Sequence, residues 1–314
     1  MCLESDNIKR LISEKAFKLG FSDIGFTSLS EFSKERQPFQ LWLKQGHHAN
    51  MKYMERNLDK RLNPSLLVDN ATTAIVVVKN YYNDSPLVKS APKISRYASG
   101  IDYHLTIKRD LKTLFDYIKA DIYPALEGRY FTDTPPLLER SIAERAGLGY
   151  IGKNSLLITP KFGSWVFIGE MLVNLPLPAD KREVPDRCGS CTRCIDACPS
   201  KAILPGRTID SRRCISWLTI ENRDKDLPGN LRESFNGWIF GCDICQEVCP
   251  WNIKNATPVD NSELVVKDEV KEVSLPEWEE LSTDSFSKLF KNSAVKRTKY
   301  SGLKRNINFV LSKK

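Results

Sequence analysis

The sequence of 314 residues lacks any apolar run long enough to span a membrane, because charged residues interrupt its longest hydrophobic stretches. Its first residues, Met-Cys-Leu-Glu-Ser-Asp, contain neither the basic start of a secretory signal nor a twin-arginine motif. These two absences argue against an integral membrane protein and against an exported one. We therefore expect a cytoplasmic protein with no membrane partner, whose thiols stay reduced.

The sequence also lacks a Walker A motif and any short motif typical of flavin binding. One stretch, Gly147-Leu-Gly149-Tyr-Ile-Gly152, has the spacing of a dinucleotide-binding motif. That site needs a strand before it and a helix after it. Here a predicted helix over 137–146 precedes the stretch and a predicted strand over 155–159 follows it. The order is reversed, so we expect no Rossmann site.

Cysteines are the most informative residues that are present, because eight of the nine fall between residues 188 and 249. The first run is Cys188-Gly-Ser-Cys191-Thr-Arg-Cys194-Ile-Asp-Ala-Cys198-Pro199, which has the C-x2-C-x2-C-x3-C-P spacing of bacterial ferredoxins. The second run has the same spacing with its first member displaced upstream, and consists of Cys214, Cys242, Cys245 and Cys249, followed by Pro250. Two 4Fe–4S clusters need eight thiolates, and the two runs supply eight.

The grouping of the eight ligands follows from the ferredoxin crossover, in which the fourth cysteine of each run binds the other cluster. We expect cluster one to be held by Cys188, Cys191, Cys194 and Cys249. We expect cluster two to be held by Cys198, Cys214, Cys242 and Cys245. The alternative is a pair of zinc sites, but these usually come as two C-x2-C knuckles, which the continuous run does not resemble.

Strands and helices alternate over the first 175 residues, which predicts an α/β or α+β layer. The run 74–78 is continuous and β-branched, as in a buried central strand, and helices are predicted over 6–19 and 104–120. A Pro-rich stretch over 176–187 predicts a linker. We expect an α+β protein with a first domain over 1–179 and a ferredoxin-like domain over 180–257. An acidic segment and a basic C-terminal tail, with a short helix around 284–292, make up 258–314.

Several longer stretches resemble one family, epoxyqueuosine reductase (QueG). They are Asn80-Tyr-Tyr82, Arg96-Tyr-Ala-Ser-Gly-Ile-Asp-Tyr-His104, Asp133-Thr134, Leu137-Leu-Glu-Arg140, Glu144-Arg-Ala-Gly-Leu-Gly-Tyr-Ile-Gly-Lys-Asn154, Arg213-Cys-Ile-Ser-Trp217-Leu-Thr219 and Lys299-Tyr-Ser-Gly-Leu-Lys-Arg-Asn306.

The resemblance implies an oxidoreductase that reduces epoxyqueuosine to queuosine at the wobble position of a tRNA anticodon. It implies a cobalamin-binding domain related to reductive dehalogenases, with electrons delivered through the two 4Fe–4S clusters. The cobalamin would be base-off, without a histidine on cobalt. This agrees with Asp102-Tyr-His104, which starts like a cobalamin D-x-H motif but has Ile107 where that motif has Gly.

The resemblance also implies roles for single residues. Asp133 matches the proton donor, and an acid that donates near neutral pH needs a raised pKa. Tyr103 and His104 match a stretch beside the corrin, although helix capping explains them equally well. Arg61 and Arg96 match positions near the cobalamin. Ser216 follows Cys214 closely enough in the sequence to face both cluster two and the corrin. Without the resemblance, Asp133 is a turn residue before Pro135, and both arginines are solvated surface groups.

Many longer relatives carry a C-terminal helical-repeat domain that grips tRNA, whereas this sequence stops a few residues after Asn306. From Ser293 to Lys314 it has seven Lys or Arg residues and no acid. We expect this tail to bind tRNA through Lys296, Arg297, Lys299, Lys304 and Arg305, although charge runs are usually solvated faces.

Two other function classes stay open. One is a corrinoid reductase of a small molecule, resembling the dehalogenases, and the other is a non-catalytic electron-transfer subunit. For the reductase of tRNA we expect a monomer that receives electrons from a flavodoxin or a ferredoxin.

Overall fold

The apolar run at 74–78 forms the centre of the main sheet in a computed structural model, which describes residues 2–84, 92–259, 262–266 and 268–311. Strand β2 (Thr73–Asn80) lies between β1 (Asp23–Ser28) and β7 (Val166–Val173), and β4 (Gly128–Phe131) pairs with the far side of β7. All three pairings are antiparallel. Every residue of β2 is buried, which confirms the predicted central strand.

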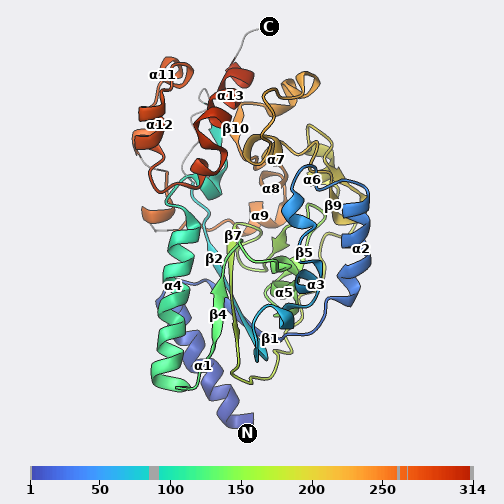
Figure 1. Cartoon of the computed structure of the whole chain (residues 1–314), viewed down its shortest axis with the longest axis vertical. Coiled ribbons are helices and arrows are strands. Elements are labelled where there is room, and N and C mark those ends of the chain that lie inside the picture. The colour runs from blue at the N-terminus through green and yellow to red at the C-terminus, as the bar shows by residue number, and fades with distance from the viewer. Residues whose placement is uncertain (1, 85–91, 260–261, 267, 312–314) are drawn as a thin grey trace.

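Helices cover both faces of this sheet, because alternate side chains of a strand point to opposite sides. Ile75 and Val77 pack into one core with side chains of α1 (Cys2–Lys18) and α4 (Tyr103–Tyr117). Ala74, Val76 and Val78 pack into a second core with α5 (Glu139–Arg145). Figure 1 shows α1 and α4 on one side and α5, α2 (Ser33–Lys44) and α3 (Leu58–Leu62) on the other. A mixed fold of this kind is the α+β class expected.

A glycine in β7 allows α4 to lie close to the sheet. A Cβ at Gly169 would lie 2.9 Å from Ile107 Cγ2 and 3.1 Å from Leu111 Cδ1. Both distances are shorter than an ordinary carbon–carbon contact, so a larger residue would push the helix away. The N-terminus of α4, which carries Tyr103 and His104, is thereby held at one end of the sheet.

Local predictions fail mainly at element ends. The helix predicted over 104–120 ends as α4 at Tyr117 and continues as one π-helical turn over Ile118–Ile122. The strand predicted over 155–159 shortens to β6 (Leu157–Ile158), which pairs with β5 (Tyr150–Ile151). The Gly147–Gly152 stretch follows helix α5, contains β5 and is followed by strand β6, so a helix precedes it and a strand follows, as predicted. Residues 175–188 contain no helix or strand.

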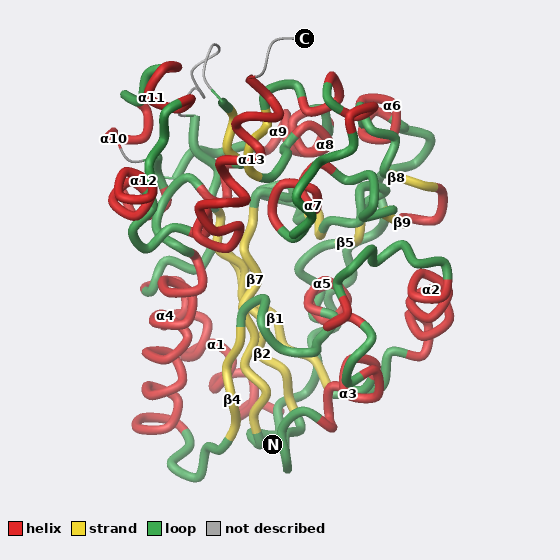
Figure 2. The backbone as a smooth tube through the Cα atoms, turned by 45° about the horizontal axis from the view of Figure 1, so that its top comes forward, coloured by secondary structure: helices red, strands yellow, loops and turns green. Residues whose placement is uncertain are grey.

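The cysteine-rich segment is built from short elements. They are α6 (Arg193–Ala197), β8 (Ile203–Leu204), β9 (Thr208–Ile209), α7 (Ile215–Ile220), β10 (Trp238–Phe240), α8 (Ile244–Glu247) and α9 (Pro250–Asn255). Strand β10 pairs in parallel with β3 (Lys93–Ile94), a strand from the first part of the sequence. Ile94 and Ala98 share a core with Ile239 and Phe240. A piece of the chain before residue 179 therefore packs with the cysteine-rich segment. Figure 2 shows α6, α7, α8 and α9 of this segment gathered beyond one end of the main sheet.

The basic tail is folded rather than extended. The segment after α10 (Asp268–Lys271), α11 (Leu275–Glu279) and α12 (Thr283–Leu289) forms a 3-10 helix, η9 (Ala294–Thr298), and then α13 (Lys299–Leu311). Leu303 and Ile307 of α13 are fully buried against the core that contains Phe240. The described helices include none that is both long and apolar enough to cross a membrane.

Candidate active site and cluster segment

Asp133 lies in the loop that joins β4 to α5. Thr132 Oγ1 donates to the carbonyl of Ile168 at 2.8 Å, which holds the loop to the sheet. Asp133 has a φ of +56°, a left-handed conformation that Asp adopts more readily than most residues. Its backbone N–H donates to the carboxylate of Glu139 in the first turn of α5. The loop is thus fixed at both ends, and it leaves the Asp133 side chain 58% exposed.

Two side chains from the start of α4 meet this aspartate. Tyr103 Oη donates to Asp133 Oδ2 at 2.8 Å, and His104 Nε2 lies 3.3 Å from the same oxygen. Asp102, the N-cap of α4, accepts the backbone N–H of His104 and lies 2.7 Å from its Nδ1. The Tyr103 ring stacks on Phe167 with centroids 4.5 Å apart. The imidazole is therefore held between two carboxylates, with both of its nitrogens engaged.

These contacts set the charges of the site. Burial alone would lower the pKa of His104, but the hydrogen bonds to Asp102 and Asp133 outweigh it and raise that pKa to about 9. Burial would raise the pKa of Asp133, but the hydrogen bonds from His104 and Tyr103 lower it below its usual value. The raised pKa that a neutral Asp133 needs is therefore absent from this arrangement. Of the two protons that face Asp133, the one on the Tyr103 hydroxyl is held because burial raises the pKa of Tyr103, so the proton available near neutral pH is on the imidazolium.

Sequence reasoning missed two carboxyls beside Asp133. Burial, and then the charge of Asp133, raise the pKa of Glu139 to about 8. Glu170 of β7 is fully buried, and burial raises its pKa well above the usual value. Glu139 stood in the quoted stretch Leu137-Leu-Glu-Arg140, and Glu170 was the single acid in an apolar strand. Both signals were visible in the sequence, but neither shows that the two side chains lie near Asp133.

Arg61 of α3 is 7% exposed and lies within electrostatic reach of Glu139, whose carboxylate accepts the backbone N–H of Asp133. Its Nη2 donates to the carbonyl of Tyr53 at 3.2 Å, and its Nε is buried without a hydrogen-bond partner in the described part of the chain. Burial lowers the pKa of Arg61, and the charge of Glu139 partly offsets that effect. A buried guanidinium with an open N–H suits an acceptor supplied by a bound cofactor, such as a corrin amide or phosphate.

Arg297 of η9 also reaches this region. Its Nε and Nη2 lie 2.9 Å and 3.1 Å from the carboxylate oxygens of Glu221. The hydrogen bond to Glu221 raises the pKa of Arg297, and the charge of Asp133 adds to that effect. One residue of the predicted tRNA-binding set therefore lies within electrostatic reach of Asp133.

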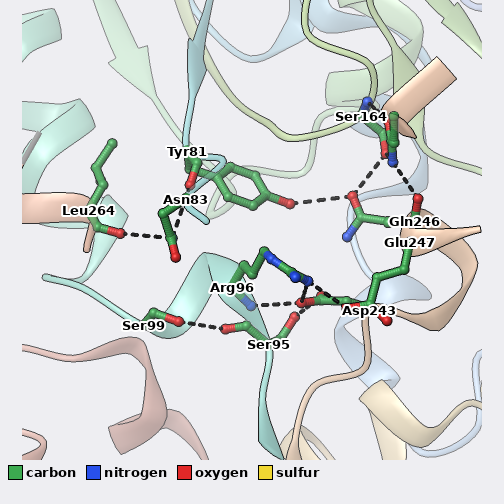
Figure 3. A network of polar contacts seen from close by, with 11 residues as sticks. Tyr81, Asn83, Ser95, Arg96, Ser99, Ser164, Asp243, Gln246, Glu247 and Leu264 are labelled. Atoms are coloured by element: carbon green, nitrogen blue, oxygen red, sulfur yellow. Dashed lines mark hydrogen bonds and ion pairs between the residues drawn. The ribbon is translucent and has the colours of Figure 1, made fainter. Parts of the chain in front are cut away.

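Arg96 contacts two carboxylates of the cysteine-rich segment. Its Nη1 donates to Glu247 Oε1 at 2.6 Å, and its backbone N–H donates to Asp243 Oδ2 at 2.8 Å (Figure 3). The guanidinium also lies over the ring of Trp165, 5.2 Å from its centroid. Arg96 thus ties the segment after β3 to residues beside Cys242, and its role as a cobalamin contact stays a prediction.

A second part of this network joins the main sheet to the same segment. Gln246, the neighbour of Cys245, accepts from Ser164 Oγ at 2.9 Å and from Tyr81 Oη at 3.4 Å (Figure 3). Asn252 Nδ2 donates to Ser164 Oγ at 2.9 Å. The end of β2 is therefore fastened to the cysteine-rich segment by buried polar contacts.

The eight thiols of the cysteine-rich segment are free of disulfides. The charges of Cys249 and Cys188 affect the pKa of Cys194, whereas those of Cys242, Cys214 and Cys198 affect the pKa of Cys245. Each of these neighbours belongs to the group predicted for its thiol, and the two groups of four ligands stay predictions. Burial raises the pKa of Cys214, and the backbone N–H groups of Trp217 and Ser216 oppose the increase. The backbone of Ser216 thus contacts Cys214, a predicted cluster ligand.

Comparison with known proteins identifies the family. Over 299 residues the chain is 45% identical to the epoxyqueuosine reductase of Leadbetterella byssophila, covering 95% of this chain and 97% of that protein. The chain belongs to the epoxyqueuosine reductase family. Residues 61–134 match the family model described as epoxyqueuosine reductase QueG, DUF1730. Residues 187–252 match the model of a 4Fe-4S double cluster binding domain.

Solved structures of the epoxyqueuosine reductase family share the fold. A complex of epoxyqueuosine reductase with an epoxyqueuosine-modified tRNA-Tyr stem loop is 29% identical, with a TM-score of 0.87, and covers 98% of this chain and 81% of its own. The Bacillus subtilis enzyme, with its catalytic loop swung out of the active site, has a TM-score of 0.88 at 29% identity and covers 98% and 82%. The predicted family, fold and pair of 4Fe–4S clusters are confirmed. The individual ligands and site residues stay predictions.

Proposed function

We propose that this protein reduces the epoxide of epoxyqueuosine to the alkene of queuosine at the wobble position of tRNA. The observation that carries the proposal is the Asp102–His104–Asp133 arrangement with Tyr103, set in the segment that matches the epoxyqueuosine reductase model. Conversion of an epoxide to an alkene and water consumes two electrons and two protons. The double cluster domain supports the supply of electrons, and the charged imidazole supports the supply of a proton.

The electrons would pass through clusters held by Cys188, Cys191, Cys194 and Cys249, and by Cys198, Cys214, Cys242 and Cys245. Cobalamin, when bound, supplies a cobalt centre that passes these electrons to the substrate. Arg61 offers its open N–H to the cofactor, and Ser216 lies beside Cys214. Both nitrogens of His104 are engaged by carboxylates, which supports a base-off cofactor with no histidine on cobalt.

Proton transfer would run through Asp133. Near neutral pH the proton is on His104, since its pKa is about 9, and His104 Nε2 is next to Asp133 Oδ2. As negative charge develops on the epoxide oxygen, the proton moves from His104 through Asp133 to that oxygen. Tyr103 donates to the same carboxylate oxygen and keeps it oriented. Asp133 therefore acts as the donor without being neutral at rest.

The tRNA surface would include the basic residues of η9 and α13. Lys296, Arg297 and Lys299 are exposed. Lys304 donates to the carbonyl of Glu279, and Arg305 donates to carbonyls of α7 and the loop after it. We assign Lys296, Arg297 and Lys299 to contacts with tRNA phosphates. We expect Lys304 and Arg305 to contribute less to tRNA binding, because they also hold α13 in place. A tRNA with a queuosine-type anticodon is the partner proposed.

We further propose that the protein is cytoplasmic and monomeric, with domains over 1–179, 180–257 and 258–314. A flavodoxin or a ferredoxin would deliver the electrons. Free thiols at the eight cysteines between residues 188 and 249 support a reducing compartment.

Anaerobic reconstitution tests the function. The protein, loaded with iron, sulfide and cobalamin, is given a chemical reductant and tRNA that contains epoxyqueuosine, and the digested nucleosides are measured by mass spectrometry. Queuosine should appear only when both cofactors are present. Turnover of halogenated aromatics but not of tRNA would favour the dehalogenase alternative. Failure to bind cobalamin at all would favour an electron-transfer subunit.

A further inference from the structure

Lys153 is a half-buried cation in the turn between β5 and β6 that the reaction proposed above does not use. Its Nζ donates to the carbonyl of Gly189 at 2.7 Å and to the carbonyl of Cys191 at 2.9 Å. Both carbonyls belong to the segment from Cys188 to Cys191, which carries the first two cysteines predicted for cluster one. The ammonium group of Lys153 is therefore held on the backbone between two predicted cluster ligands.

Backbone hydrogen bonds fix the turn that presents Lys153. The Gly152 N–H donates to the carbonyl of Leu156 at 2.8 Å, and the Ser155 N–H donates to the carbonyl of Gly152 at 2.9 Å. A Cβ at Gly152 would lie 2.5 Å from Ile158 Cδ1, so the close approach of the two sides of the turn requires glycine there. The position of Lys153 is thus set by the β5–β6 pair and not by the cysteine-rich segment itself.

A charge of the opposite sign contacts the same segment. Asp186 Oδ1 accepts the backbone N–H of Cys188 at 2.9 Å, and its other oxygen pairs with the guanidinium of Arg207. Arg207 in turn donates to the carbonyl of Ile151 in β5. The charge of Asp186 is therefore balanced by Arg207, whereas the two contacts of Lys153 are with neutral carbonyls. This leaves the cluster-one segment with one excess positive charge from these three side chains.

We propose that Lys153 is a positioning residue of the electron route, which fastens the cluster-one segment and raises the reduction potential of that cluster. The inference rests on the proposed ligand group of Cys188, Cys191, Cys194 and Cys249. A 4Fe–4S cluster with four thiolate ligands is anionic, and reduction adds one electron and one negative charge without making or breaking a bond. A neighbouring cation favours the reduced form. The proposed flavodoxin or ferredoxin supplies that electron and is itself oxidised by one electron.

The sign of a potential shift separates this role from a structural one. If Lys153 only fastened the segment, its loss would admit water to the cluster. Water favours the more highly charged reduced form, so the reduction potential would rise. Loss of a neighbouring positive charge has the opposite effect, because the reduced form loses more stabilisation than the oxidised form. The two roles therefore predict shifts in opposite directions.

The first test is a redox titration of anaerobically reconstituted Lys153→Gln, followed by electron paramagnetic resonance without tRNA. One of the two cluster midpoints should become more negative, so that the ratio of reduced to oxidised cluster at the wild-type midpoint falls about tenfold, which is 59 mV for one electron. Lys153→Arg keeps the charge and should keep the wild-type midpoint. Lys112→Gln, which removes an exposed lysine of α4 paired with Asp116, is the matched control and should change neither midpoint.

Asp186→Asn is the second variant, and it decides the question if Lys153→Gln does not retain cluster one. Its amide oxygen still accepts the Cys188 N–H, but the charge of Arg207 is no longer balanced, so the same midpoint should become more positive. An unchanged or more positive midpoint in Lys153→Gln, or any other result in Asp186→Asn, would overturn the inference. If the wild type does not reduce epoxyqueuosine, the proposed function fails, whereas the midpoints still report the effect of Lys153.

Discussion

Replacing Asp133 with Asn tests the charge arrangement and the chemistry together. The two carboxylates around His104 raise its pKa from 6.5 to about 9, a preference for the imidazolium of about 3 kcal/mol. Asp102 Oδ1 lies 2.7 Å from the ring and Asp133 Oδ2 lies 3.3 Å from it. Because the closer carboxylate contributes more, loss of the Asp133 charge should lower the pKa of His104 by about one pH unit.

The pKa can be measured directly, because the sequence has only three histidines. Isotope-labelled His104 would be followed by NMR through a pH titration and assigned by its loss in His104→Gln. Since the folded-state pKa is the higher one, the imidazolium stabilises the fold below pH 6.5, and this contribution is lost as the pH rises through about 9. In Asp133→Asn that loss should be smaller and should be complete at a lower pH.

Turnover of the same variant should fall by about a hundred- to ten-thousand-fold with both clusters and cobalamin retained, because the amide has no proton to transfer. Near-normal turnover would make Asp133 a turn residue only. An unchanged pKa of His104 would refute the ion pair on which the proton route depends.

Three further predictions concern the rest of the chain. Cys198→Ala should damage the cluster of Cys214 and spare the other, as seen by electron paramagnetic resonance; equal damage to both would contradict the crossover. Lys296→Gln with Lys299→Gln should flatten the slope of log tRNA affinity against log salt by about one to two, at roughly 0.7 per phosphate contact, while an unchanged slope would place the tRNA elsewhere. Arg305→Gln should lower the free energy of unfolding by about 1–3 kcal/mol, since several carbonyls lose a charged donor. Equal denaturation midpoints of the wild type and Arg305→Gln would show that Arg305 does not stabilise the fold and is available to bind RNA.

Local sequence patterns predict much of the secondary structure of this protein and both of its clusters. The spacing of the cysteines identified two clusters because a cubane constrains ligands that are close in sequence. The run at 74–78 identified the central strand because a strand buried on both faces has no polar positions. The predicted order of helix before strand around Gly147 is also found, because both elements follow from local patterns.

Contacts between distant segments were decided only by the tertiary structure. The sequence shows Glu170 as an acid inside a strand, but only the pairing of β7 with β4 brings it beneath the Asp133 loop. It shows Arg96 as a free cation, but the packing of β3 on β10 brings it to Asp243 and Glu247. It shows the tail as a run of charge, whereas burial of Leu303 and Ile307 makes it a helix.

The direction in which the pKa of Asp133 shifts was also wrong from sequence. That pKa depends on two side chains, Tyr103 and His104, which lie some thirty residues away in the chain. In the folded protein they are 2.8 Å and 3.3 Å from the Asp133 carboxylate. Local propensity and ligand spacing act over a few residues, whereas the charge on a buried group is set by whatever the fold places beside it.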